Sequence, residues 1–217
     1  MKVIKAGCEI ITPISDGGIE ELKHIEKIGR VCYKSEDKII EDGESAKKFV
    51  KMLIDRGHEA MIEHSSLSVK FIVDRGVSHE LVRHRIASFA QESTRYCNYS
   101  KDKFGQEVTF IEPLFYSKVT TQKDIRNYFS WKKAMESAEM YYFNMINEGA
   151  TPQEARSVLP NSTKTEIVIT ANYREWRNFF KLRTASVAHP QMVEVTRPLL
   201  EELKEKLPII FDDIEVI

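Results

Sequence analysis

The run of residues 83–96 constrains this chain strongly, because it concentrates charged and hydrogen-bonding groups that a protein core has no use for. Its fourteen residues include three arginines, a histidine, a glutamate, a glutamine and three Ser or Thr side chains. As a helix, the run would place Arg83, Ala87 and Ala90 on one stripe. Guanidinium groups bind phosphates and carboxylates, and each charged hydrogen bond contributes roughly 1.5–3 kcal/mol. The run therefore indicates either a solvated amphipathic helix or an anion-binding surface.

Length and composition describe an ordinary globular chain of 217 residues, with 42% hydrophobic and 30% charged residues. We see no linker or repeat and expect a single domain over residues 1–217. The net charge of −1 argues against a general nucleic-acid binder. Cys8, Cys32 and Cys97 form no C-x-x-C pair, which suits a reducing compartment. No apolar run approaches the roughly 18–20 residues of a membrane span, so we expect a cytoplasmic protein.

Hydrophobic periodicity predicts both helices and strands. Apolar residues three or four apart predict helices over 19–33 and 43–56, and alternation over 67–73 predicts a strand with one buried face. Three further strands are predicted: one over 2–14 interrupted at Gly7, a short one within 108–114 of an otherwise irregular interval 97–125, and one over 165–170. A helix is predicted to start at His79, with Ser78 as its cap, and to continue into residues 83–96, and a helix over 125–147 is predicted to have mostly core aromatic and Met side chains. The last predicted helices are a short one opened by a capping box at 151–154, one from Asn172 to Arg183, and a closing one over 191–206.

Residues 83–96 resemble the signature block of the flavin-dependent thymidylate synthases, the ThyX family. Arg83-His84-Arg85 is followed after seven residues by Ser93, within the hexapeptide Gln91-Glu92-Ser93-Thr94-Arg95-Tyr96. Three further segments resemble the family in the same order: a Gly-His segment ending in Glu-His at 57–64, Ala-Arg-x-x-Leu-Pro at 155–160, and Asn172-x-Arg174 with Asn178 and Arg183. Between 184 and 197 the match loosens, and no roles are carried over there.

This resemblance implies an α/β fold of the α+β type, in which one domain holds a central, mostly antiparallel sheet flanked by helices. The flavin site would not be a Rossmann site, and the chain contains no G-x-G. The implied reaction is reductive methylation of dUMP to dTMP, with 5,10-methylenetetrahydrofolate as carbon donor, NADPH as hydride source and FAD as hydride carrier. The family also implies a homotetramer with active sites shared between subunits, and no nucleic-acid or membrane partner.

The resemblance assigns residue roles as well. Arg183 would stabilise the ionised uracil ring, because a guanidinium stays charged beside an anion. Flavin contacts fall on Ala60, Glu63, Arg83, His84, Arg85, Gln91, Asn172, Tyr173, Arg174 and Asn178, with His58 as a catalytic residue near the isoalloxazine ring. Substrate contacts fall on Glu80, Arg83, Gln91, Glu92, Ser93, Thr94, Arg95, Arg156 and Arg183. We expect Ser93, also placed in the catalytic group, to orient the phosphate, because an unactivated hydroxyl is a weak nucleophile.

Other functions would use some of the same residues. An RNA-binding module would use the arginines and the tyrosine of residues 83–96, but the near-zero net charge and the lack of an RNP, KH or zinc-knuckle pattern weigh against it. His58 and His64 do not match zinc-ligand spacing, so we expect no metal. An inactive relative is disfavoured by the retention of Arg183, Ser93 and Arg95. We expect Cys97 to be a small apolar filler, since nothing marks its thiol as acidic.

Overall fold

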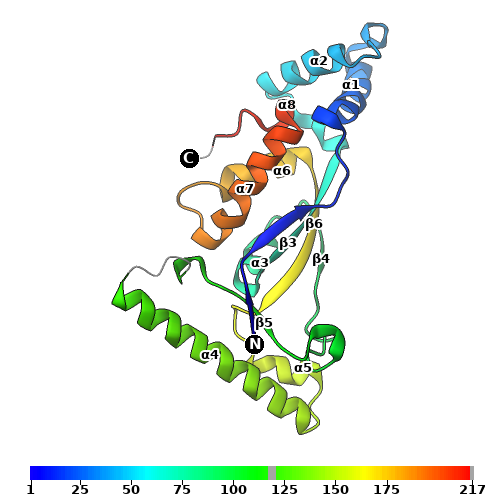
Figure 1. Ribbon diagram of the computed structural model, residues 1–217. Coiled ribbons are helices and arrows are strands. Elements are labelled where there is room, and N and C mark those ends of the chain that lie inside the picture. Colours follow the sequence, from blue (N-terminus) through cyan, green and yellow to red (C-terminus); the bar gives the residue numbers. More distant parts are fainter. Residues whose placement is uncertain (117–120, 216–217) are drawn as a thin grey trace. The chain divides into compact units, whose positions relative to one another are not determined.

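The computed structural model describes residues 1–116 and 121–215 (Figure 1). In chain order its elements are β1 (Lys2–Ile4), β2 (Gly7–Ile10), α1 (Ile19–Tyr33), α2 (Glu44–Asp55), η3 (Glu59–His64), β3 (Ser66–Asp74), α3 (Arg75–Leu81), β4 (Ser88–Gln91), β5 (Thr109–Ile111), α4 (Gln122–Asn147), α5 (Pro152–Ala155), η6 (Arg156–Val158), β6 (Lys164–Asn172), α6 (Tyr173–Arg183), α7 (Pro190–Lys206) and α8 (Pro208–Phe211), where η marks a 3₁₀ helix. Within the described residues, no helix is both long enough and apolar enough to cross a bilayer.

The strands form two sheets. A two-stranded sheet pairs β1 with β5 in parallel, and a four-stranded sheet has the order β2-β3-β6-β4. The two central strands of the larger sheet are antiparallel, because the amide of Tyr173 donates to the carbonyl of Ser65 at one end and the amide of Arg75 donates to the carbonyl of Asn161 at the other, at 3.0 and 2.9 Å. The predicted α/β class with an antiparallel sheet and helices is confirmed.

The chain divides into two compact units. The first comprises Met1–Gly7, Phe71–Arg83 and Ala90–Val168, and the second comprises Cys8–Lys70, His84–Phe89 and Ile169–Ile217. Each unit therefore gathers segments that are far apart in the sequence, and both β3 and β6 contribute residues to each. Residues 83–96, a continuous motif in the sequence, are divided between the two units.

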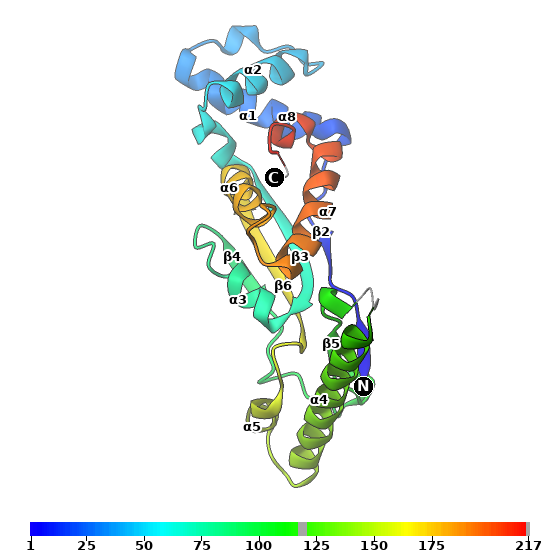
Figure 2. The same ribbon diagram turned by 90° about the vertical axis from the view of Figure 1, so that its left-hand side faces the viewer.

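The core of the first unit forms where α4 runs beside β5 (Figure 2). Phe110 of β5, opposite Val3 of β1, packs in a buried cluster with Tyr99, Met135 and Tyr142. Such side chains each contribute roughly 1.5–3 kcal/mol when they leave water. This cluster stabilises the loop that contains the second half of the Arg-rich run (residues 83–96).

Helix α4 also has an exposed side. Phe129, Met140 and Tyr141 are 55%, 49% and 56% exposed, whereas Met135 and Tyr142, seven residues apart on one stripe, are buried. The prediction that the aromatic and Met side chains of this helix are mostly core is therefore wrong for the three exposed residues. The reason is geometric, because with 3.6 residues per turn only one stripe of a 26-residue helix faces the cluster.

The second unit packs its helices against the adjoining parts of β3 and β6. Burial alternates along both strands, as predicted for β3. The indole nitrogen of Trp176, which is 1% exposed, donates to the carbonyl of Leu67 at 2.9 Å and ties α6 to β3. Phe180 stacks on Trp176, and Figures 1 and 2 both show α7 beside α6. This packing gives α6 a fixed orientation, which matters because α6 carries most of the candidate site.

Most predicted elements are confirmed. The helices predicted over 19–33, 43–56, 125–147, from Asn172 to Arg183 and over 191–206 are α1, α2, α4, α6 and α7. The strands predicted over 67–73 and 165–170 lie within β3 and β6, and the interval 108–114 contains β5. The strand predicted over 2–14 is two strands, β1 and β2, which belong to different sheets. In the interval 97–125, residues 117–120 lie outside the described residues.

The predicted start of α3 is wrong. Its cap is Asp74, whose carboxylate accepts a hydrogen bond from the amide of Val77 at 2.7 Å, and Ser78 lies inside the helix. A carboxylate cap interacts favourably with the unpaired N–H groups of a helix N-terminus. The helix therefore begins earlier than the predicted start at His79, and it ends at Leu81.

The prediction that residues 83–96 continue this helix is also wrong. They form a turn, then β4, then a second turn, so Arg83, Ala87 and Ala90 share no helical stripe. β4 is hydrogen-bonded to β6, and the amide of Glu92 donates to the carbonyl of Glu166 at 2.8 Å just beyond it. Strand pairing satisfies backbone groups that a helix would otherwise have satisfied.

Candidate functional site

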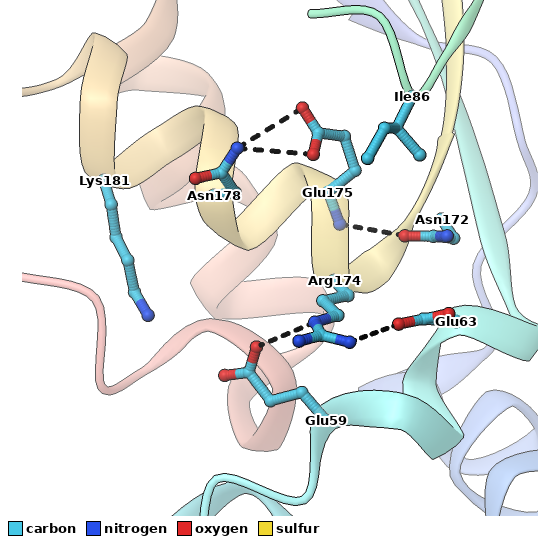
Figure 3. Close-up of a pocket in the computed structure, with 8 residues that line it drawn as sticks. All are labelled: Glu59, Glu63, Ile86, Asn172, Arg174, Glu175, Asn178 and Lys181. Carbon is cyan, nitrogen blue, oxygen red and sulfur yellow. Dashed lines mark hydrogen bonds and ion pairs between the residues drawn. The ribbon is translucent and has the colours of Figure 1, made fainter.

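A pocket of about 530 Å³ lies in the second unit at the start of α6 (Figure 3). Helix α6 contributes Arg174, Asn178 and Lys181, whose spacing of four and three residues places them on one face of the helix. The pocket is lined by Glu59, Glu63, Ile86, Asn172, Arg174, Glu175, Asn178 and Lys181.

The pocket collects residues that the sequence placed in one group. Four of the predicted flavin contacts line it: Glu63, Asn172, Arg174 and Asn178. Sequence reasoning missed the other four, which are Glu59, Ile86, Glu175 and Lys181. The helical spacing from Arg174 is a signal that would have found Lys181. Glu175 lies three residues before Asn178 on the same helix, so helical spacing also indicates it, whereas Glu59 and Ile86 are brought to the pocket by tertiary packing.

Arg174 crosses the pocket between two carboxylates. Its guanidinium forms a short hydrogen-bonded ion pair with Glu63, and its Nε lies 4.0 Å from Glu59 (Figure 3). The hydrogen bond that Arg174 donates to Glu63 raises the pKa of Arg174. Both partners are exposed, with side chains 52% and 42% accessible, so water screens the pair and it can open at little cost.

Two asparagines of the pocket differ in which side-chain amide groups they leave available to a ligand. Asn172 caps α6: its side-chain oxygen accepts from the amide of Glu175 at 2.8 Å, which leaves its NH₂ group for a ligand. Asn178 donates its Nδ2 toward the two carboxylate oxygens of Glu175 at 3.5 and 3.3 Å, which are long contacts. The amide groups therefore line the pocket in orientations set by α6 itself.

Beside the pocket, Glu175, His84 and Arg183 form a connected chain. His84 is 7% exposed, its Nδ1 lies 3.1 Å from Glu175, and the Nε of Arg183 donates to its Nε2 at 2.9 Å. The ring of Phe179 packs against the imidazole in an edge arrangement, at a centroid distance of 4.8 Å and an interplanar angle of 66°. Burial lowers the pKa of His84, the hydrogen bond with Glu175 opposes that change, and the charge of Arg183 adds to it. His84 is therefore neutral at neutral pH.

The other predicted residues of the second unit lie apart from this pocket's lining. His58 is exposed, with its Nδ1 3.4 Å from the hydroxyl of Tyr33, and Ala60 and Arg85 are exposed as well. Tyr173 is 1% exposed and packs against Phe211, and burial raises its pKa. The structure thus places the Tyr173 side chain in the core.

In the first unit, two residues of the Arg-rich run are hydrogen-bonded inward. Glu92 accepts from the hydroxyl of Tyr99 at 3.1 Å and from the ammonium of Lys164 at 3.0 Å. The amide of Gln91 donates to Ser78 and Thr165 at 3.0 and 3.2 Å. These hydrogen bonds join the Arg-rich run to β6 and α3.

The phosphate candidates of the first unit are more open. Arg156 donates from Nη1 to the hydroxyl of Thr94 at 3.3 Å, which joins η6 to the Arg-rich run. Arg95 is exposed, and its guanidinium carbon lies 5.4 Å from the centre of the Tyr96 ring. Arg83 is also exposed, and Glu80 is partly buried in α3. This unit therefore presents three arginines near its surface or in contact with the run.

Within the described residues, nothing activates the hydroxyl of Ser93 or the thiol of Cys97. The Oγ of Ser93 accepts from the amide of Arg95 at 3.3 Å, an orientation that suits a hydrogen-bonding role. Burial raises the pKa of the Cys97 thiol, and Cys97 packs against the buried cluster with Tyr99 and Tyr142, as predicted for a small apolar filler.

Comparisons with known proteins show the family of the chain. The family model described as thymidylate synthase complementing protein matches residues 19–209. A flavin-dependent thymidylate synthase from Corynebacterium aurimucosum is 30% identical over 208 residues, which cover 94% of this chain and 84% of that protein. One from Pyrococcus furiosus is 36% identical over 160 residues, or 73% of this chain and 63% of that protein. The chain belongs to this thymidylate synthase family.

A solved structure has the same fold. The crystal structure of the UMP/dUMP methylase PolB from Streptomyces cacaoi, bound with 5-Br dUMP, superposes with a TM-score of 0.78 at 23% identity, covering 98% of this chain and 96% of that one. At this identity the likeness shows the shared fold alone.

One buried arginine of this family member was missed by sequence reasoning. Arg177 is 2% exposed, its Nη2 binds Asp213 at 2.7 Å and its Nε binds Glu59 at 3.0 Å. Burial alone would lower the pKa of Arg177, but its ion pairs, led by Asp213, raise it overall, and Arg177 in turn lowers the pKa of Asp213. Arg177 thereby holds both the C-terminal segment and a carboxylate of the pocket.

Proposed function

We propose that this chain is a flavin-dependent thymidylate synthase that methylates dUMP to dTMP, with 5,10-methylenetetrahydrofolate as carbon donor and NADPH-reduced FAD as hydride carrier. The observation that carries the proposal is the pocket of Figure 3, where four residues that the family resemblance assigns to the flavin meet although they come from η3, β6 and α6. Membership of the thymidylate synthase family over residues 19–209 supports the same reaction.

The pocket's donor set fits an anionic dinucleotide. Arg174 and Lys181 supply two cations, and Asn172 and Asn178 supply amide groups. Ile86, which is 70% exposed, adds an apolar surface of the kind that a flat ring covers. When bound, FAD supplies the hydride carrier, and the chain's task is to hold and orient it. Arg174 would exchange Glu63 for a ligand phosphate, since guanidinium groups bind phosphates in bidentate fashion.

On the substrate side, Arg183 stabilises the negative charge of the ionised uracil ring. Arg95, Arg156 and the hydroxyl of Ser93 bind the dianionic phosphate, for which charged donors are the strong hydrogen-bond partners. The following contacts remain predictions: His58, Ala60, Arg83, His84, Arg85, Gln91 and Tyr173 with FAD, and Glu80, Arg83, Gln91, Glu92 and Thr94 with dUMP.

The proposal includes an assembly and a setting. Residues 1–217 act as one synthase domain, as the span of the family model supports, in a homotetramer whose active sites are shared between subunits. Contacts to FAD and dUMP then come from more than one chain. The three free cysteines suit a reducing cytoplasm.

The test is the visible absorption spectrum of the purified protein with and without dUMP, followed by turnover of dUMP. We expect flavin bands that shift when dUMP is added, and formation of dTMP that requires methylenetetrahydrofolate and NADPH. Arg174→Ala should weaken FAD binding, while His24→Ala, an exposed change on α1, should not. A protein that neither contains FAD nor takes it up would overturn the proposal. RNA affinity with a steep salt dependence would then favour the RNA-binding alternative.

A further inference from the structure

We propose that Glu175 and His84 are positioning residues for Arg183: the Glu175 carboxylate selects one tautomer of His84, and the remaining ring nitrogen then holds the Arg183 guanidinium in place. This inference rests on the proposed function, in which Arg183 faces the uracil ring. It assigns His84 a role within the chain that requires no contact with FAD.

The hydrogen bonds determine the tautomer without ambiguity. The Nε of an arginine is a donor only, so the His84 nitrogen that it meets at 2.9 Å, Nε2, must present a lone pair. A neutral imidazole carries one N–H, which is then on Nδ1 and donates to the Glu175 carboxylate at 3.1 Å. A carboxylate accepts and never donates when it is ionised, so the direction of the chain cannot reverse.

Helix geometry supports the same assignment. Glu175, Phe179 and Arg183 are spaced by four residues along α6 and therefore lie on one side of the helix, with His84 received between them. The ring of Phe179 packs against the imidazole in an edge arrangement, and only 7% of His84 is exposed. Glu175 and Arg183 are the two charged groups that act on the imidazole, and both belong to α6. Such enclosure limits the ring to one orientation.

Positioning by His84 has a chemical consequence for Arg183. Holding the Nε–H restricts rotation of the planar guanidinium about its long side chain, which would otherwise sample many rotamers. An anion that develops in the transition state gains most from a donor that is already in place. Glu175 also lines the pocket proposed for FAD, so the same carboxylate borders the cofactor side and aligns the substrate side.

The plain alternative is that the buried Glu175–His84 pair only stabilises the fold. The two roles differ in what they predict. A fold-stabilising pair would change the unfolding free energy and leave kcat of the folded enzyme unchanged. A positioning pair lowers kcat in variants that remain folded and still bind FAD, because a misplaced catalytic group costs up to roughly 100-fold in rate.

The first experiment is nitrogen-15 NMR of the histidine side chains in the wild-type protein at pH 7.5, without added ligand. His84→Phe, which keeps a ring but removes both nitrogens, assigns the signal. We expect a protonated Nδ1 and an unprotonated Nε2 for His84. The opposite tautomer, or a charged ring at this pH, would overturn the inference.

The second experiment measures kcat and KM for dUMP together with the flavin spectrum. His84→Phe and Glu175→Ala should lower kcat roughly 10- to 100-fold while bound FAD is retained. Glu175→Gln, whose amide oxygen still accepts from Nδ1–H, should recover most of the activity, and His24→Phe is the matched control. Wild-type kcat in folded His84→Phe would reject the positioning role but leave the synthase proposal intact. Absence of flavin and turnover in the wild type would reject the synthase proposal, while the tautomer remains measurable.

The pH profile separates positioning from folding further. Protonation of His84 would place an N–H opposite the Nε–H of Arg183 and break their hydrogen bond, so kcat should fall on the acid side of 6.5. Replacing Glu175 by Gln removes a charge that raises the pKa of His84, so the acid limb should move to lower pH. An acid limb that stays in place in Glu175→Gln would contradict the assignment.

Discussion

Arg177→Ala should lower the free energy of unfolding by about 3–5 kcal/mol, the usual loss when one partner of a buried ion pair is removed. Arg177 is 2% exposed and binds Asp213, Glu59 and the carbonyl of Ile210. Its removal leaves the carboxylate of Glu59, whose side chain is only 19% exposed, with Arg174 at 4.0 Å as the remaining cation. It also opens a cavity in the core of the second unit, which adds to the loss.

Urea unfolding followed by tryptophan fluorescence measures this effect, because Trp176 is the neighbouring residue in α6. The midpoint should fall without a change in the m-value. Arg174→Ala, three residues earlier in the same helix, is the matched control: the Arg174 side chain is 52% exposed and its ion pair is screened by water, so this variant should lose only a small part of that stability. Asp213→Asn should fall between the two, because Glu59 still faces the buried guanidinium.

Two outcomes would refute this reasoning. A loss in Arg177→Ala no larger than that in Arg174→Ala would mean that burial of the ion pair does not determine its contribution. If Asp213→Asn lowered the free energy of unfolding as much as Arg177→Ala, Asp213 alone, and not Asp213 together with Glu59, would hold the guanidinium.

Three further results are expected. Arg183→Ala should abolish dTMP formation while FAD remains bound, which the visible spectrum and a turnover assay report; unchanged turnover would remove Arg183 from the mechanism. Asn172→Ala should lower the free energy of unfolding by about 0.5–2 kcal/mol through loss of the α6 cap, and Asn172→Asp should restore it in urea titrations. Below pH 6.5 the unfolded chain protonates His84 before the folded chain does, because burial lowers the folded pKa. Stability should therefore fall from pH 6.5 down to that lowered pKa, and His84→Phe should lose this dependence in urea titrations across the range.

Local patterns were sufficient for much of the fold. The amide of Thr151 donates to Glu154 at 2.7 Å at the predicted capping box, and Asn172 caps α6 as predicted, because these hydrogen bonds join residues only three apart. The alternation along β3 and the helical spacing over α1 and α7 are likewise local, and the structure follows them. The family blocks in the sequence also named four residues that meet in one pocket.

Residues 83–96 show where local patterns fail. Their composition suits an amphipathic helix, but β4 lies next to β6 in the sheet, and backbone pairing with a strand some 75 residues later decides the conformation. A similar limit applies to α4, where the periodicity alone does not say which apolar stripe finds a partner and which stays exposed.

The arginines of α6 show most clearly what the sequence determines and what only the tertiary structure determines. The sequence alone places Arg174, Arg177 and Arg183 on one helix, because the apolar spacing and the Asn172 cap are contained in that segment. Their partners are Glu63, Asp213 and His84, which lie 111, 36 and 99 residues away in the chain. Whether a guanidinium lines a pocket, is buried in an ion pair or is held by an imidazole depends on those partners and on how much water each site retains. Only tertiary packing sets those two conditions, because desolvation and charge pairing depend on distances through space.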